Sequence, residues 1–166
     1  MKNIYIIGGT MGVGKTAVCQ ELKKRLPASV FLDGDWCWDM HPFQVNDETK
    51  AMVIQNITFL LNQFIRCSAY ENIIFCWVMH EQSIIDTIVE QLEATDCKVK
   101  TISLVCDEVA LRERLQKDID DGIRMADVME RSIARIPLYS QLNTMKIDTA
   151  EKSISQVCKE LMKMYG

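Results

Sequence analysis

The chain has 166 residues, of which 48% are hydrophobic and 25% charged, which is enough to bury one core of ordinary globular size. A net charge of −4 and a pI near 5.2 exclude the basic surface of a general nucleic-acid-binding protein. No apolar run approaches the roughly twenty residues of a membrane span, and the apolar start is too short for a signal peptide. We expect a single domain, residues 1–166, in the cytoplasm, with no nucleic-acid or membrane partner, as a monomer or homodimer.

Cysteine usage indicates a reducing compartment. No two of the seven cysteines form a C-x-x-C pair. Most lie in apolar stretches, where a free thiol behaves as a small buried hydrophobe. The pattern favours neither a zinc site nor a disulfide framework.

Short apolar runs alternate with segments of helical period along the whole chain. Strands are predicted over residues 3–8, 30–32, 72–79, 99–106 and 145–149. Helices are predicted over residues 15–26, from 48, from 83, from an N-cap at Asp107 to about 117, from 127 to a kink or break near Pro137, and from a capping box at Ser153 and Gln156. Residues 118–122 are predicted to form a charged turn. Five strands separated by helices imply an α/β fold, an open parallel sheet that binds ligands at the carboxyl ends of its strands.

The segment from Gly9 to Thr16 matches the pattern G-x-x-x-x-G-K-[ST] and lies between a predicted buried strand and a helix. Backbone N–H groups of such a loop surround phosphate oxygens, Lys15 reaches the β- and γ-phosphates, and Thr16 offers its hydroxyl to Mg²⁺. The alternative is a glycine-rich turn without a ligand. The residues expected to surround the phosphates are Gly9, Met11, Gly12, Val13, Gly14, Lys15, Thr16 and Ala17.

Two carboxylates, Asp33 and Asp35, follow the second predicted strand. Residues two apart on a strand point the same way, so both are expected to face the phosphates, with Gly34 leaving room for a ligand. The alternative is an ordinary Asp-Gly-Asp turn. The end of the third strand carries no acid, since only His80 precedes Glu81 there.

Aromatic residues are concentrated directly after these acids. Trp36, Trp38, His41 and Phe43 predict a wall for an acceptor with a ring or an apolar face. They are equally compatible with a small core that closes the loop against the following helix.

These motifs together resemble the small P-loop kinases, a group that includes shikimate kinase, gluconate kinase, adenylylsulfate kinase, chloramphenicol phosphotransferase and the nucleoside monophosphate kinases. The features that carry the resemblance are the phosphate loop, the strand end at Asp35, the arginine-rich helix after the fourth strand, and the segment 147–149. The resemblance implies a three-layer P-loop NTPase fold with strand order 2-3-1-4-5 and helices on both faces. It also implies a substrate region at about 36–66, a lid at about 116–126, and binding of ATP and Mg²⁺.

The resemblance also implies roles for particular residues. Asp33 would lie on the metal side together with Thr16, and Asp35 would accept the proton of the acceptor hydroxyl, as phosphoryl transfer requires. Asp148 and Thr149 would pass beside the adenine.

Arginines in the second half fit a lid. Arg114 matches the family arginine that packs over the adenine and approaches the phosphates, with Arg112 as the alternative. A second lid arginine is usual four residues later, where this chain has Asp118. The candidates to replace it are Arg124, Arg131 and Arg135. Alternatively, these arginines are solvated helix charges.

The expected function is ATP-dependent phosphorylation of a hydroxyl on a small molecule, with Lys15, Asp35 and Arg114 as the catalytic residues. The alternatives are a nucleoside or nucleotide kinase, an NTPase or regulatory protein without an acceptor, and a degenerate kinase fold that only binds. Residues 36–65 contain one cation, Lys50, so a neutral or cationic acceptor is predicted. The residues expected to contact it are Asp35, Trp36, Trp38 and Arg131.

Overall fold

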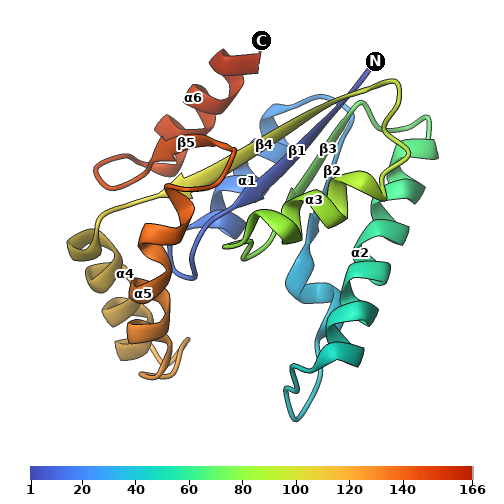
Figure 1. Ribbon diagram of the computed structural model, residues 1–166. Helices are drawn as coiled ribbons and strands as arrows, with labels where there is room; N and C mark the ends of the chain where they lie inside the picture. Colours follow the sequence, from blue (N-terminus) through green and yellow to red (C-terminus); the bar gives the residue numbers. More distant parts are fainter. Residues whose placement is uncertain (166) are drawn as a thin grey trace.

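The computed structural model describes residues 1–165 and contains one five-stranded parallel sheet (Figure 1). Its strands are β1 (Lys2–Gly8), β2 (Ser29–Asp33), β3 (Asn72–Cys76), β4 (Cys97–Val105) and β5 (Met145–Asp148). Their order across the sheet is β2-β3-β1-β4-β5, as the resemblance to the small P-loop kinases implies. The fold class is therefore confirmed.

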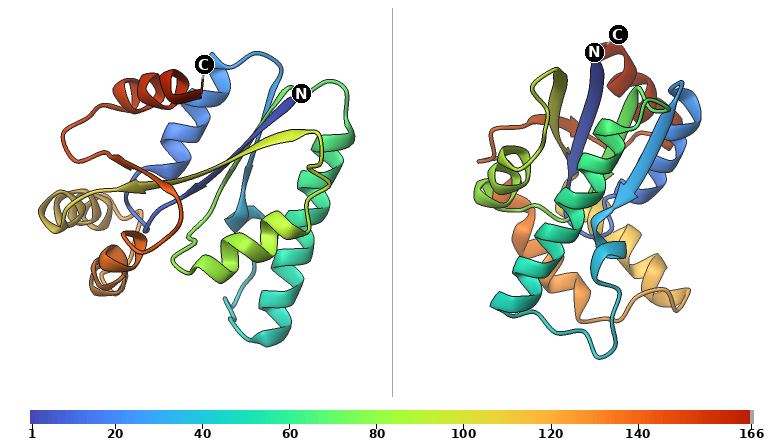
Figure 2. Two further views of the ribbon diagram at one scale, coloured as in Figure 1. Left: turned by 45° about the horizontal axis from the view of Figure 1, so that its top comes forward. Right: turned by 90° about the vertical axis from the view of Figure 1, so that its right-hand side faces the viewer.

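Helices cover both faces of this sheet. They are α1 (Lys15–Arg25), the 3-10 helix η1 (Gly34–Trp38), α2 (Asp47–Arg66), α3 (Gln82–Glu90), α4 (Glu108–Asp120), α5 (Val128–Tyr139) and α6 (Ile154–Tyr165). Residues of α1 and α6 pack on one face, and residues of α2 and α3 pack on the other. The pair α4 and α5, and the start of α2, project beyond the carboxyl ends of the strands (Figures 1 and 2). Within residues 1–165 no helix is both long and apolar enough to span a membrane.

The central strand β1 divides the core in two. Ile4 and Ile6 pack with α2 and α3, whereas Tyr5 and Ile7 pack with α1 and α6. All four side chains are buried, because a parallel strand covered on both faces has no solvent side. This burial fixes the end of β1, from which the phosphate loop leaves.

The predicted starts of α4 and α6 are confirmed by their caps. The Asp107 carboxylate accepts a hydrogen bond from the N–H of Ala110 at 2.7 Å. At α6 the Ser153 hydroxyl accepts from the N–H of Gln156 at 3.2 Å, and the Gln156 side chain accepts from the N–H of Ser153 at 2.7 Å. These reciprocal bonds form the predicted capping box.

The third strand is shorter than predicted, because it ends at Cys76 and not at Met79. The N–H of Trp77 makes a last bond to the carbonyl of Ile7 at 3.2 Å, and β1 then ends, so β3 has no further partner. Trp77 and Met79 are nevertheless buried. An apolar run reports burial, and it does not distinguish a strand from a buried loop.

The predicted charged turn at residues 118–122 is wrong for its first three residues, because α4 continues to Asp120 and the turn begins at Asp121. An i,i+4 bond of 2.8 Å from Gln116 to Asp120 supports this last turn. The chain reverses only at Gly122, where φ is 73°.

We expect a kink or break near Pro137. This proline lies within the last turn of α5, and the helix ends two residues later, at Tyr139. A proline there removes only one helical bond.

Replacing Ser153 by Ala is expected to lower the free energy of unfolding by about 1 kcal/mol, because α6 loses its N-cap. Urea denaturation measures this change. Ser68, which is exposed and outside any cap, provides the control as Ser68→Ala. A loss for Ser153→Ala no larger than that of the control would contradict the assigned cap.

Candidate active site

The phosphate loop joins β1 to α1, and its glycines allow close packing. Gly12 has φ of 86°, and a Cβ on it would lie 2.5 Å from Cδ2 of Leu115 on α4. Gly14 has φ of 101° and precedes α1 as its N-cap, where a Cβ would meet nothing within 4 Å. Side chains are therefore excluded at Gly12 by packing, whereas Gly14 borders open space at a helix N-terminus, which suits an anion.

Hydrogen bonds fix this loop to the rest of the molecule. The buried Thr10 hydroxyl donates to the carbonyl of Ser132 on α5 at 3.0 Å. The Lys15 amine donates to the carbonyl of Thr10, also at 3.0 Å. The position of α5 is thus tied directly to the loop that carries Lys15.

Asp33, at the end of β2, is buried and engaged. Its Oδ2 accepts from the Thr16 hydroxyl at 2.8 Å, and its Oδ1 accepts from the N–H of Asp35 at 3.0 Å. Two hard oxygens, on Thr16 and Asp33, therefore meet beside the phosphate loop. Among residues 1–165 no cluster of three or more His, Cys, Asp or Glu could hold a metal. This donor set nonetheless fits Mg²⁺, which commonly takes one or two protein oxygens and completes its shell with water and phosphate.

Asp35 lies in η1 and not on the strand, which corrects the prediction that the two acids share a strand face. It is exposed at the site, and its Oδ1 accepts from Nε1 of Trp77 at 3.1 Å. Local burial and the charge of Asp33 raise the pKa of Asp35, whereas Lys15 and the indoles of Trp77 and Trp38 oppose the shift. A carboxyl with a raised pKa is suited to accept a proton.

Burial lowers the pKa of Lys15, while the neighbouring Cys76, Asp35 and Asp33 act in the opposite direction. The lysine and both predicted acids are therefore brought into one site.

Trp77 is a site residue that the sequence analysis missed. Its ring lies against Gly34, where a Cβ would come within 2.5 Å of the indole. This contact explains the glycine between the two acids. The available signal was a tryptophan at the end of an apolar strand, since a buried indole N–H needs an acceptor and the nearest acids follow the neighbouring strand.

The structure separates Trp36 from Trp38, two of the residues predicted to form an aromatic wall. Trp38 makes edge-to-face contacts with Trp77 at 5.5 Å and with Phe43 at 5.1 Å. Trp36 instead contacts Phe31 at 5.3 Å, and Phe31 belongs to the core on the opposite face of the sheet. The expectation that Trp36 and Trp38 form one wall is therefore wrong, because these two residues of η1 point to different sides of the sheet.

Arg114 links the phosphate loop to the segment after β5. It donates to the Thr149 hydroxyl at 2.9 Å, to the Thr149 carbonyl at 2.6 Å and to the Val13 carbonyl at 3.2 Å. Asp148 accepts from the N–H of Ala150 at 2.9 Å, which shapes the same segment. The residues predicted to border the adenine thus lie together. The Arg114 guanidinium is occupied by backbone and hydroxyl oxygens of this segment.

The other arginines differ in their surroundings. Arg112 pairs with Glu108 and Glu130. Arg131 is exposed on α5, with no polar partner among residues 1–165.

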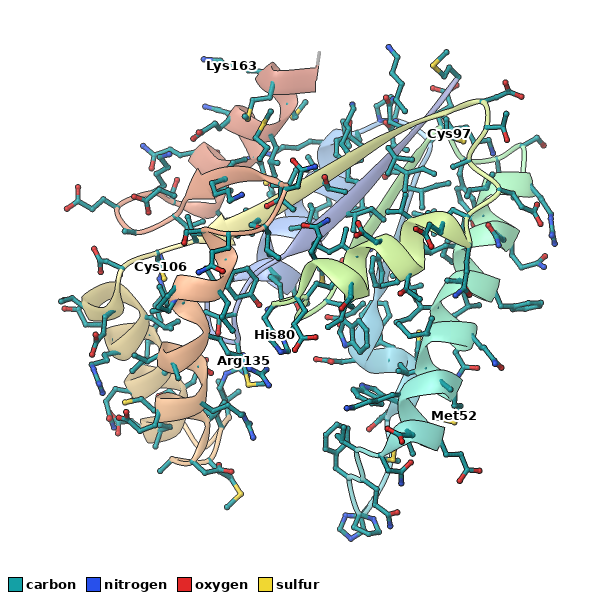
Figure 3. The ribbon with its side chains drawn as sticks, viewed as in Figure 1. Met52, His80, Cys97, Cys106, Arg135 and Lys163 are labelled. Carbon is teal, nitrogen blue, oxygen red and sulfur yellow. The ribbon has the colours of Figure 1, made fainter. Side chains whose placement is uncertain are left out.

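Arg135 is half-buried and points toward His80 from across the site (Figure 3). Burial and the charge of Arg135 lower the pKa of His80, and its Nδ1 is buried without a hydrogen-bond partner in the described part of the chain. This side of the site therefore offers polar groups that the protein itself does not satisfy.

Comparison with known proteins gives a family and a fold. Residues 6–135 match the family model described as AAA domain. No curated protein matches the chain in sequence.

Among solved structures, the tunicamycin resistance protein of Deinococcus radiodurans superposes with a TM-score of 0.76 at 21% identity, covering 100% of this chain and 96% of that one. A gluconokinase from Sinorhizobium meliloti gives 0.68 at 17% identity, covering 97% and 90%. Shikimate kinase from Acinetobacter baumannii, in complex with shikimate, gives 0.62 at 17% identity, covering 99% and 92%. The fold is therefore that of the small P-loop kinases.

Replacing Trp77 by Phe is expected to raise the pKa of Asp35. The indole hydrogen bond of Trp77 stabilises the ionised carboxylate, and the variant loses this bond. The aromatic packing on Gly34 is kept. A ¹³C NMR titration of labelled aspartate carboxyls measures the change, with Asp35→Asn to assign the signal.

Trp36→Phe is the matched control, because the ring of Trp36 packs on Phe31, whereas the indole bond to Asp35 comes from Trp77. An unchanged Asp35 titration in Trp77→Phe would show that the indole bond does not stabilise this carboxylate.

Proposed function

Because the chain belongs to the AAA domain family and has the fold of the small P-loop kinases, we propose that it transfers the γ-phosphoryl group of ATP to a hydroxyl of a small molecule. The second carboxylate carries this proposal. Asp33 is engaged with Thr16, whereas Asp35 lies exposed beside the phosphate loop with a raised pKa. A protein that only binds nucleotide has no need of a second, exposed acid poised to take a proton.

Thr16 and Asp33 would hold Mg²⁺, with Asp33 acting through water. When bound, the ion neutralises charge on the β- and γ-phosphates. The loop from Gly9 to Ala17 binds the phosphates through its N–H groups, and the Lys15 amine exchanges the Thr10 carbonyl for a phosphate oxygen. Arg114, Asp148 and Thr149 border the adenine.

Asp35 orients the acceptor hydroxyl and takes its proton as the oxygen bonds to the γ-phosphorus. Its bond from Trp77 holds one carboxylate oxygen in place, which leaves the other for the hydroxyl. The acceptor lies in the region of residues 36–66, under a lid formed by about 116–126.

We assign the aromatic wall to Trp38 and Phe43 and not to Trp36, which packs on the other face. His80 and Arg135, with Arg131 at the edge, supply hydrogen bonds to acceptor oxygens on the opposite side. A neutral, hydroxyl-rich acceptor with a ring fits this combination. One protein with this fold is named for resistance to the antibiotic tunicamycin, which supports an antibiotic-like or nucleoside-like acceptor.

A nucleotide kinase is the second candidate, because Arg135 has no ion pair among residues 1–165 and could receive an acceptor phosphate. We place the reaction in the cytoplasm, which the seven free thiols support, and expect a monomer or homodimer.

Lys15→Ala is expected to abolish phosphoryl transfer while the fold survives, because the Lys15 amine contacts the loop and phosphates and not a core. ADP release with a panel of hydroxyl acceptors measures activity, and circular dichroism checks folding. Lys163→Ala, at the far end of α6 (Figure 3), is the control for losing a lysine. Comparable turnover in folded Lys15→Ala would exclude the kinase function.

Asp35→Asn is expected to lower kcat by about 10²-fold or more with little change in ATP affinity, because the variant cannot accept the hydroxyl proton. Turnover at saturating ATP and acceptor, together with a separate ATP titration, separates the two effects. A collapse of Mg·ATP binding with an unchanged rate at saturation would instead make Asp35 the metal-side acid.

A further inference from the structure

Three aromatic rings in contact lead from the proposed base to the surface. The indole of Trp77, which is only 8% exposed, donates to Asp35 at 3.1 Å. Its ring packs edge-on against Trp38 with a centroid distance of 5.5 Å, and Trp38 packs in the same way against Phe43 at 5.1 Å. Trp38 is half-buried, and Phe43 is 61% exposed. This aromatic row, Trp77, Trp38 and Phe43, therefore forms one apolar surface that begins beside Asp35 and ends in solvent.

The loop that carries the outer end of the row stays apolar beyond it. Val45, two residues after Phe43, is also exposed, and we call these two side chains the loop rim. Residues 36–46 contain a single charged side chain, that of Asp39. Figure 1 shows this loop and the start of α2 projecting beyond the carboxyl ends of the strands. Exposed apolar side chains that continue a site in this way mark a surface that a ligand or partner covers.

The other side of the site carries a second exposed apolar pair, Ile123 and Met125, in the turn between α4 and α5. We call this pair the lid rim. The Asp118 carbonyl holds the turn by accepting from the N–H of Ile123 at 2.8 Å. The charged side chain between the pair, that of Arg124, donates to the Asp118 carboxylate at 2.9 Å and is thereby turned back to α4. Figures 1 and 2 show this turn and the loop before α2 on the two sides of the site, so apolar groups flank it on both sides.

The position of the two rims indicates what covers them. Because the aromatic row is continuous with the place of Asp35, an apolar chain laid along the row belongs to the molecule whose hydroxyl reaches that acid. A protein seated over both rims would instead close the path by which an acceptor enters. The single charge in residues 36–46 also offers little to a polar partner, whereas methylene groups can be buried there at no cost in desolvated charge.

We propose that the acceptor is amphipathic, with a hydroxyl-bearing head at Asp35 and an unbranched apolar chain that runs along Trp38 and Phe43 and leaves the site between the two rims. The inference rests on the proposed function and narrows its class of acceptor. Contacts of the chain lie outside the reacting centre, and their binding energy positions the head. A ring stacked on Trp38 would leave both rims in water, whereas a chain covers them.

The test uses n-alkyl β-glucosides, which combine a hydroxyl-bearing ring with an unbranched chain. Calorimetry measures binding of the methyl, butyl, hexyl and octyl compounds, each below the concentration at which it forms micelles, to the protein loaded with Mg²⁺ and a non-hydrolysable ATP analogue. A fully buried methylene raises affinity about fourfold, and one covered on one side only raises it about twofold. We therefore expect affinity to rise at least about tenfold from the butyl to the octyl compound.

Phe43→Ser is expected to lose most of this dependence on chain length, because the chain loses the outer end of the aromatic row. Replacing both Ile123 and Met125 by Ser is expected to lose a smaller part. Phe59→Ser is the matched control, because Phe59 on α2 is almost equally exposed, at 63%, and lies outside the row. This control should keep the full dependence, and circular dichroism checks that each variant folds.

No gain in affinity from the butyl to the octyl compound in the wild type would overturn the proposal, as would an equal gain in Phe43→Ser. Binding to phosphatidylcholine vesicles that needs Phe43, without any dependence on chain length, would also overturn it and would assign the rims to a membrane surface. An unchanged gain in the variant at Ile123 and Met125 would overturn only the role of the lid rim. Failure to bind Mg·ATP, measured separately, would overturn the proposed function itself, whatever the result with the glucosides.

Discussion

Close backbone packing of the phosphate loop is the constraint on which the rest of the site depends. Leu115 of α4 occupies the space that a side chain at Gly12 would need, and the carbonyl of Leu104 lies 2.8 Å from where a Cβ on Gly9 would lie. Thr10 adds the bond to Ser132 of α5. Strand β4 and helices α4 and α5 therefore pack directly against this loop, and Arg114 of α4 donates to its Val13 carbonyl.

The two acids, Asp33 and Asp35, lie in different surroundings. Asp33 is buried and accepts two hydrogen bonds, from Thr16 and from the backbone of Asp35, which fix both of its carboxylate oxygens. Asp35 has an exposed surface, and partial burial of its carboxyl and the charge of Asp33 raise its pKa, while Lys15 and Trp77 limit the increase. A pair of carboxyls in unlike environments can divide metal binding from proton transfer within a few residues of chain.

The parts of the fold that local chemistry decides could be predicted from the sequence. The alternation of apolar runs with helical segments predicted the five strands, the caps at Asp107 and Ser153 predicted two helix starts, and the resemblance to the small P-loop kinases implied the strand order. Contacts between distant residues could not be predicted in this way. The turn at Asp35 depends on the ring of Trp77, 42 positions away, and the end of α4 depends on the N–H groups of Ile123 and Arg124, which return to the Asp118 carbonyl.

The end of β3 carries no acid, and the surroundings of this position explain why. Cys76 occupies that end, beside Asp33 in the sheet register, and is fully buried. A carboxylate there would add a third negative charge to those of Asp33 and Asp35, which lie beside Lys15. The free-energy cost of burying this carboxylate would be offset by too little positive charge. Cys76 places no carboxyl group there, and the indole of Trp77, the next residue, donates to Asp35. The absence of an acid at the end of β3 therefore leaves Asp33 and Asp35 without a third carboxylate beside them at this edge of the sheet.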